Sequence, residues 1–129
     1  AEVGRENMNR ASNALKEFPD WTLIEGDVAD VSFDEIVEEF DAIILDLPEP
    51  WPVISELSKK LRYGGRIACY CPVSSQLEKA WEACEEAGLK VDWAGEMMER
   101  VWTKASRGGV RPGNTPMGHT AFLLIAERT

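Results

Sequence analysis

Residues 41–51 read Asp41-Ala42-Ile43-Ile44-Leu45-Asp46-Leu47-Pro48-Glu49-Pro50-Trp51, an apolar run that ends on a carboxylate and enters a turn between prolines. The run from Ala42 to Leu45 lacks polar alternation, which predicts a strand covered on both faces, as in a parallel sheet. Doubly wound sheets bind ligands outside the carboxyl ends of their strands. Asp46 is therefore a candidate site residue, and the alternative is an aspartate that only accepts hydrogen bonds from the turn.

The size and composition of the chain indicate one globular domain, or part of one. It has 129 residues and 44% hydrophobic content, which is enough for a core. No stretch approaches the ~20 apolar residues of a membrane span, and no basic, apolar leader opens the chain. Because the first residue is Ala1 and a helix follows almost at once, we expect a fragment of a larger protein.

The cysteines indicate a reducing compartment. Cys69 and Cys71 lie two apart in an apolar run, so both side chains face the same side of a strand, where reduced thiols pack in a core. With Cys84 and His119 far away in sequence, they do not supply the spacing of a zinc site. We therefore expect a cytoplasmic protein without a metal site.

The net charge of −9 argues at first sight against a nucleic-acid partner, but the charge is unevenly distributed. Residues 1–50 carry 14 acids and 3 bases, whereas residues 100–129 carry 1 acid and 5 bases. Arg100, Lys104, Arg107 and Arg111 stand in a stretch without acids that also contains Trp102. This stretch fits a phosphate backbone, and the alternative is a basic loop in solvent.

Helices and strands alternate along most of the chain. Apolar residues at spacings of three and four predict helices, one of them opened by Ser32 with Glu35 as a capping box and another closed by Gly64-Gly65. The predicted helices cover residues 5–18, 32–40, 51–62 and 74–87. The predicted strands cover residues 21–25, 42–45, 66–71, 89–93 with an extension to 104, and 120–126.

This order predicts an α/β fold with a doubly wound, mostly parallel sheet. Two successive strands at the end predict an antiparallel hairpin on one edge. Nicotinamide-type Rossmann domains usually continue in alternation, whereas Rossmann-like S-adenosyl-L-methionine (SAM)-dependent methyltransferases end in an antiparallel pair. The strand ends agree with the second class.

Short motifs along the whole chain resemble the tRNA (adenine-N1)-methyltransferases that modify the T-loop adenine. The most specific are Asp46-Leu47-Pro48-Glu49-Pro50-Trp51 and the closing Gly118-His119-Thr120-Ala121-Phe122. The others are Glu2, Gly26-Asp27, Tyr63-Gly64-Gly65-Arg66, Tyr70-Cys71-Pro72, Gln76 and Arg111-Pro112. The resemblance implies that residues 1–129 are part of the catalytic domain, with the first strands and the glycine-rich SAM loop upstream.

The resemblance also implies roles for individual residues toward SAM. Glu2 would accept both ribose hydroxyls of the cofactor, since a carboxylate offers two oxygens. Asp27 would accept from the adenine amino group, with the Val28 amide beside it. Taken alone, Gly26-Asp27 reads as an ordinary turn. Without the glycine-rich loop, we expect these 129 residues by themselves to be inactive.

For the substrate, the resemblance implies that Asp46 faces the target adenine of a tRNA and stabilises the charge that methylation of N1 creates. Tyr70 would stack on or bond the base, Gln76 belongs to the same motif set, and Arg111 and His119 would reach the pocket or its phosphates from a loop. Pro48, Pro50 and Trp51 would shape the pocket wall. The family forms tetramers, so we expect a homotetramer.

Two other functions fit the same fold. One is a non-catalytic tRNA-binding or assembly subunit, which would need neither Asp27 nor Asp46. The other is a methyltransferase acting on a small molecule, against which the basic stretch and the Pro-x-Pro-Trp turn argue.

Overall fold

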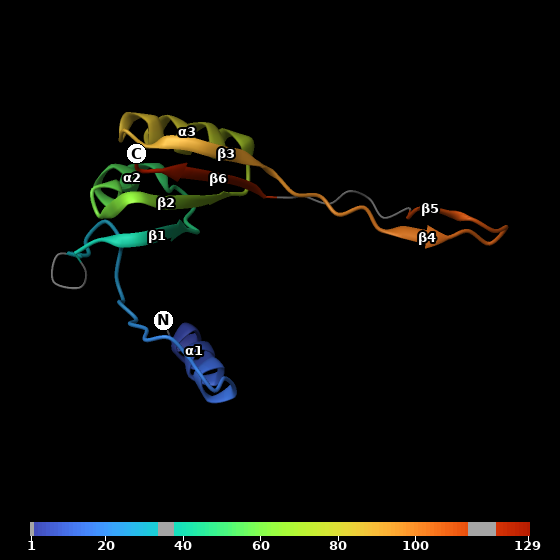
Figure 1. The fold of residues 1–129 in the computed structure, drawn as a ribbon, viewed down its shortest axis with the longest axis horizontal. Coiled ribbons are helices and arrows are strands. Elements are labelled where there is room, and N and C mark those ends of the chain that lie inside the picture. Colours follow the sequence, from blue (N-terminus) through green and yellow to red (C-terminus); the bar gives the residue numbers. More distant parts are fainter. Residues whose placement is uncertain (1, 34–37, 114–120) are drawn as a thin grey trace. The chain divides into compact units, whose positions relative to one another are not determined.

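The computed structural model describes residues 2–33, 38–113 and 121–129, which form two compact units, Ala1–Ser32 and Phe33–Thr129 (Figure 1). The prediction that all 129 residues belong to one catalytic domain stays a prediction.

The first unit consists of helix α1 (Glu2–Ala14) and an irregular segment. Arg5 pairs with Glu25 at 3.4 Å, which ties the helix to this segment. The strand predicted over residues 21–25 does not form, and this prediction is wrong. The reason is that a strand needs a neighbour for its backbone hydrogen bonds, and no described strand pairs with this segment.

The second unit is built on a four-stranded sheet with the order β1-β2-β6-β3. Its strands are β1 (Phe40–Leu45), β2 (Leu61–Cys71), β3 (Lys90–Glu96) and β6 (Phe122–Glu127). β1 and β2 are parallel, whereas β6 is antiparallel to both β2 and β3. The predicted antiparallel pair at the edge is confirmed. The last strand lies between β2 and β3, so that β3 forms the edge.

Two helices pack on one face of this sheet, α2 (Trp51–Ser58) and α3 (Ser74–Glu86) (Figure 1). They cover alternate residues of the strands, among them Leu45, Ile67 and Leu124, and Ile54 of α2 is fully buried against them. Cys69, Cys71 and Cys84 are all buried and free, which confirms the prediction of reduced packing thiols.

The opposite face of the sheet carries a row of apolar side chains. The register aligns Ile44 with Ala68, Ala68 with Ile125, and Ile125 with Trp93 across all four strands. Ile44 is 79% exposed, so the prediction that its strand is covered on both faces is wrong for the described residues. The two described helices of this unit, α2 and α3, pack on the other face, and no described helix of the unit covers the row.

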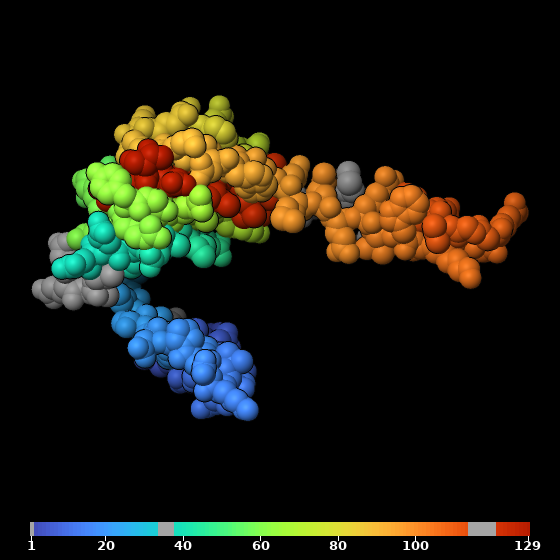
Figure 2. All heavy atoms as spheres, in the orientation of Figure 1, coloured from blue at the N-terminus to red at the C-terminus, as the bar shows by residue number. Residues whose placement is uncertain are grey.

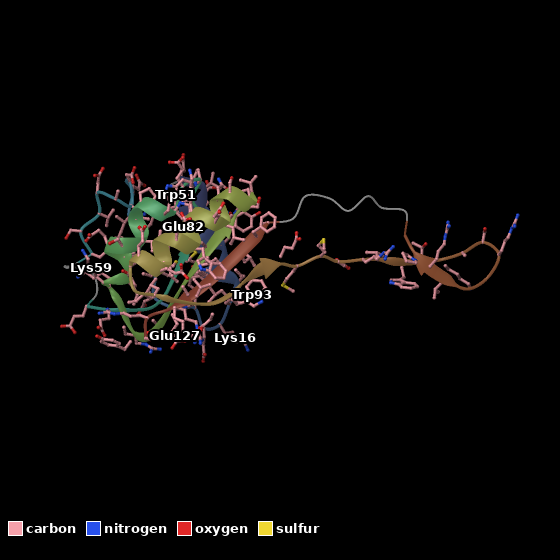
Figure 3. The ribbon with its side chains drawn as sticks, turned by 90° about the horizontal axis from the view of Figure 1, so that it is seen from above. Lys16, Trp51, Lys59, Glu82, Trp93 and Glu127 are labelled. Carbon is pink, nitrogen blue, oxygen red and sulfur yellow. The ribbon has the colours of Figure 1, made fainter. Side chains whose placement is uncertain are left out.

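Polar residues flank this row at one end. Arg66 pairs with Glu127 at 2.9 Å and with Asp92 at 3.5 Å, and Lys90 pairs with Asp92 at 3.2 Å. Figure 3 shows Trp93 and Glu127 on the neighbouring strands β3 and β6. These ion pairs join three strands on the exposed side of the sheet.

Several predicted element bounds shift because the sheet recruits nearby residues. The helix predicted to reach residue 62 ends at Ser58, since the Phe40 amide donates to the Lys60 carbonyl and β2 begins at Leu61. A Cβ at Gly65 would lie 2.8 Å from the Arg62 carbonyl within β2 and 3.1 Å from the Asp41 carbonyl of β1, so only glycine fits this close approach of the two strands. The helix predicted over residues 32–40 lies partly outside the described residues, and Phe40 belongs to β1.

The region between β3 and β6 also differs from expectation. β3 ends at Glu96, so the predicted extension to residue 104 is wrong. A separate two-stranded sheet follows, formed by β4 (Trp102–Lys104) and β5 (Val110–Pro112). Its turn contains Gly108 and Gly109, whose φ angles of 92° and 82° suit glycine.

Candidate active site

Asp46 and Tyr70 lie at the same edge of the sheet. The register pairs Leu45 with Cys69 in parallel strands, so Asp46 and Tyr70 are the next residues along β1 and β2. Leu45 and Cys69 point into the core, whereas Asp46 and Tyr70 are exposed. The structure therefore brings these two predicted site residues to the carboxyl ends of adjacent strands, where such sheets bind ligands.

Gln76 connects the loop after β1 to the first turn of α3. Its side-chain Nε2 donates to the Pro48 carbonyl at 2.8 Å, and its Oε1 accepts from the Val73 amide at 3.2 Å. The backbone amide of Gln76 in turn donates to the Val73 carbonyl at 3.1 Å. Both polar atoms of this side chain are therefore engaged by backbone, which holds the loop that follows Asp46.

Two further contacts fix the same loop. Pro50 precedes α2 and is fully buried, so it anchors the loop from inside while Pro48 remains exposed. Trp51, labelled in Figure 3, begins α2. The Lys79 Nζ lies 4.6 Å from the centre of its ring. Lys79 was not predicted. Its position one helical turn after Gln76, on the same face of α3, is the sequence signal that would have identified it.

The residues predicted to contact SAM belong to the first unit. Glu2 opens α1 and is exposed. Asp27 forms a local turn, in which its Oδ1 accepts from the Ala29 amide at 3.0 Å and its carbonyl from the Asp30 amide at 3.0 Å. Val28 is half-buried within this turn. Residues 27–30 thus form an ordinary turn, as Gly26-Asp27 alone predicts, and this turn engages only one of the two carboxylate oxygens of Asp27.

The remaining predicted site residues lie between β3 and β6. Arg111 is in the middle of β5, opposite Thr103, and is exposed. It therefore belongs to a strand, and its expected place in a loop is wrong. The reason is that β4 supplies the hydrogen-bonding partner. His119 lies outside the described residues.

The buried thiols do not form part of this site. The pKa of Cys69 is raised by its hydrogen bond with the Cys84 thiol and then by burial, and burial also raises the pKa of Cys71. Within residues 2–33, 38–113 and 121–129, no cluster of three or more His, Cys, Asp or Glu side chains is arranged to hold a metal ion. In the same ranges no helix is long and apolar enough to cross a membrane.

A sheet whose last strand is inserted antiparallel between parallel strands, with an acid at the carboxyl end of β1, defines the Rossmann-like methyltransferase class. Solved structures agree. The TrmI tRNA (m1A58) methyltransferase of Aquifex aeolicus is 25% identical with a TM-score of 0.64, and the alignment covers 80% of this chain and 40% of that one. A SAM-dependent O-methyltransferase of Thermotoga maritima is 27% identical with a TM-score of 0.62, over 77% and 38% of the two chains.

The chain belongs to the family described as tRNA methyltransferase complex GCD14 subunit, whose model matches residues 7–107. Among curated relatives, the tRNA (adenine(57)-N(1)/adenine(58)-N(1))-methyltransferase TrmI of Methanocaldococcus jannaschii is 37% identical over 149 aligned residues. That alignment covers 98% of this chain and 51% of the relative, so the chain spans about half the length of this protein.

Proposed function

We propose that the protein containing this chain transfers a methyl group from SAM to N1 of a T-loop adenine in tRNA. The observation that carries the proposal is Asp46 at the carboxyl end of β1, beside Tyr70 and followed by a loop that Gln76 and Lys79 hold to α3. Membership of the family and the names of its relatives support the choice of tRNA and of the adenine.

The proposed reaction requires stabilisation of charge more than removal of a proton from the nucleophile. Adenine N1 carries a lone pair, and methylation leaves a cationic ring. A carboxylate at Asp46 that accepts from the exocyclic amino group stabilises this charge and can take up the amino proton. The base must first leave the folded tRNA, and Tyr70, exposed next to Asp46, would then stack on it.

The chemistry of the exposed acids fits the cofactor. SAM supplies the electrophilic methyl group. The two oxygens of Glu2 suit vicinal ribose hydroxyls, and the free oxygen of Asp27 suits an adenine amino group. We further infer a cytoplasmic location, supported by the three free cysteines, and a homotetramer, supported by the family resemblance.

The test uses the whole protein encoded by the gene, labelled SAM and a tRNA transcript. The expected product is N1-methyladenosine at the T-loop. Asp46→Ala is expected to lower kcat by about 10²- to 10³-fold, the effect of removing one preorganised charge stabiliser. Glu78→Ala removes an exposed carboxylate from α3 and serves as the control. Unchanged turnover in Asp46→Ala removes Asp46 from the mechanism, and no N1-methyladenosine from the unaltered protein rejects the function.

A further inference from the structure

We propose that the hairpin formed by β4, β5 and their turn, residues 100–113, is a surface that contacts the phosphate backbone and bases of the RNA substrate. The proposal rests on the proposed function for the identity of the RNA. It concerns a part of the chain outside the sheet edge that carries Asp46.

The hairpin has a defined backbone that fixes which side chains share a face. The register pairs Trp102 with Pro112, Thr103 with Arg111, and Lys104 with Val110. Because directly opposite residues point to the same side, Trp102, Lys104 and Val110 share one face, and Arg111 lies on the other. The Gly113 amide extends this ladder by donating to the Val101 carbonyl at 2.7 Å.

Cations of the hairpin differ from those of the rest of the chain in having no acid beside them. Elsewhere most arginines and lysines pair with a carboxylate, as Arg66 does with Glu127, or lie over an aromatic ring, as Lys79 does. Within the described ranges, no hydrogen bond or ion pair engages the side chains of the four hairpin cations, and all four residues are exposed. These are Arg100, Lys104, Arg107 and Arg111.

The charge distribution directs a polyanion to this surface. The whole chain carries −9, and residues 100–113 carry four bases and no acid, so the other residues carry −13 in total. A polyanion is repelled by that remainder and attracted by the hairpin. The four unpaired cations lie within twelve residues and on both faces of the hairpin, so they suit phosphates that pass along its edge, to which guanidinium groups donate two parallel hydrogen bonds.

Exposed apolar side chains on the same hairpin favour a partner that offers flat rings. Trp102 is 60% exposed and Val110 is 70% exposed, and they share a face with Lys104. A two-stranded sheet of this size is marginal in water by itself, so a partner that covers this face stabilises it. Unpaired bases of an RNA loop stack on tryptophan, whereas an acidic protein surface would satisfy only the cations.

The test compares two double variants of the whole protein that remove the same charge. Lys104→Ser/Arg107→Ser alters the hairpin, and Lys16→Ser/Lys59→Ser alters exposed lysines elsewhere. Binding of tRNA is measured between 50 and 200 mM salt, without SAM. The slope of log K against log salt is expected to become shallower by about 0.7 to 0.9 for each lost phosphate contact. Raising the salt from 50 to 200 mM therefore lowers the tRNA affinity of the hairpin variant by a factor about tenfold smaller than the factor for the unaltered protein.

Two further variants separate contact from structure. Lys104→Arg/Arg107→Lys keeps both charges and is expected to keep the slope. Trp102→Ser is expected to weaken binding by about five- to a hundredfold with the slope unchanged, because stacking on a base is not ionic. The apparent KM for tRNA is expected to rise more than kcat falls in the Lys104→Ser/Arg107→Ser variant.

Equal slopes in the two double variants would overturn the proposal. So would a change of oligomeric state in the hairpin variant, measured by sedimentation, without a change of slope, because the hairpin would then be a contact between subunits. The proposed function fails separately: the unaltered protein would then bind tRNA with its steep salt dependence but form no N1-methyladenosine.

Discussion

Replacing Gln76 tests whether its side chain holds the loop after Asp46. Gln76→Glu keeps an oxygen that can accept from the Val73 amide but removes the donor to the Pro48 carbonyl, whereas Gln76→Leu removes both hydrogen bonds. Each such bond contributes about 0.5–1.5 kcal/mol, and a carboxylate in the first turn of α3 adds about 0.3–1 kcal/mol through the helix dipole. The glutamate variant is therefore expected to lose less than about 1 kcal/mol of global stability, and the leucine variant about 2 kcal/mol.

The assay separates global stability from the order of the loop. For a chain of this size, about 1 kcal/mol corresponds to roughly 4 °C in Tm, so the leucine variant is expected to melt about 8 °C lower and the glutamate variant within about 4 °C of the unaltered protein. Amide exchange at Val53, whose amide donates to the Pro50 carbonyl at the end of this loop, is expected to be about fivefold faster in both variants, since each loses about 1 kcal/mol of local restraint. Exchange at Val53 that equals the unaltered rate in Gln76→Glu would refute the reasoning.

Three further predictions concern the fold. Gly65→Ala places a Cβ 2.8 Å from a backbone carbonyl and is expected to cost about 1–3 kcal/mol in urea denaturation, whereas Gly4→Ala meets nothing within 4 Å and is expected to be neutral or stabilising. Ile54→Ala truncates a fully buried side chain of α2 and is expected to cost about 2–5 kcal/mol, with a smaller loss for Ile54→Val. A hydrogen bond from Lys90 holds the pKa of Asp92 below its ordinary value, so the charged form stabilises the fold above the pKa of the unfolded chain. This contribution is lost as pH falls through the lowered pKa, and Asp92→Asn is expected to weaken the acid-dependent loss of stability that circular dichroism follows.

The sequence predicts the second unit well because its signals are local. The apolar run before Asp46, the helical spacing of α2 and α3, and the apolar last strand each specify an element within about ten residues. The pairing of two strands at the end of the chain also follows from their order. Whether the last strand occupies the edge or the interior of the sheet depends on contacts distant in sequence, and these leave no local pattern.

Predictions that depended on neighbours were the ones that failed. The segment 21–25 has the composition of a strand, but no described strand offers it hydrogen bonds. Ile44 has the pattern of a doubly covered strand, but the described helices α2 and α3 pack on the other face. At the site, the motif predicts Gln76 as a site residue. Its hydrogen bond to the Pro48 carbonyl could not be predicted, because it joins residues 28 positions apart.

The place of β6 within the sheet affects the order of folding during synthesis. Arg66 of β2 and Glu127 of β6 are 61 residues apart, and among the described strands β3 pairs only with β6. Figure 2 shows the red atoms of this last strand between those of β2 and β3. On the ribosome, β1, α2, β2 and α3 can therefore associate early, while β3 must wait for residues 122–127. Until those residues emerge, one edge of β2 and the whole of β3 expose unpaired backbone, and this stage is where the chain is most prone to associate with other chains.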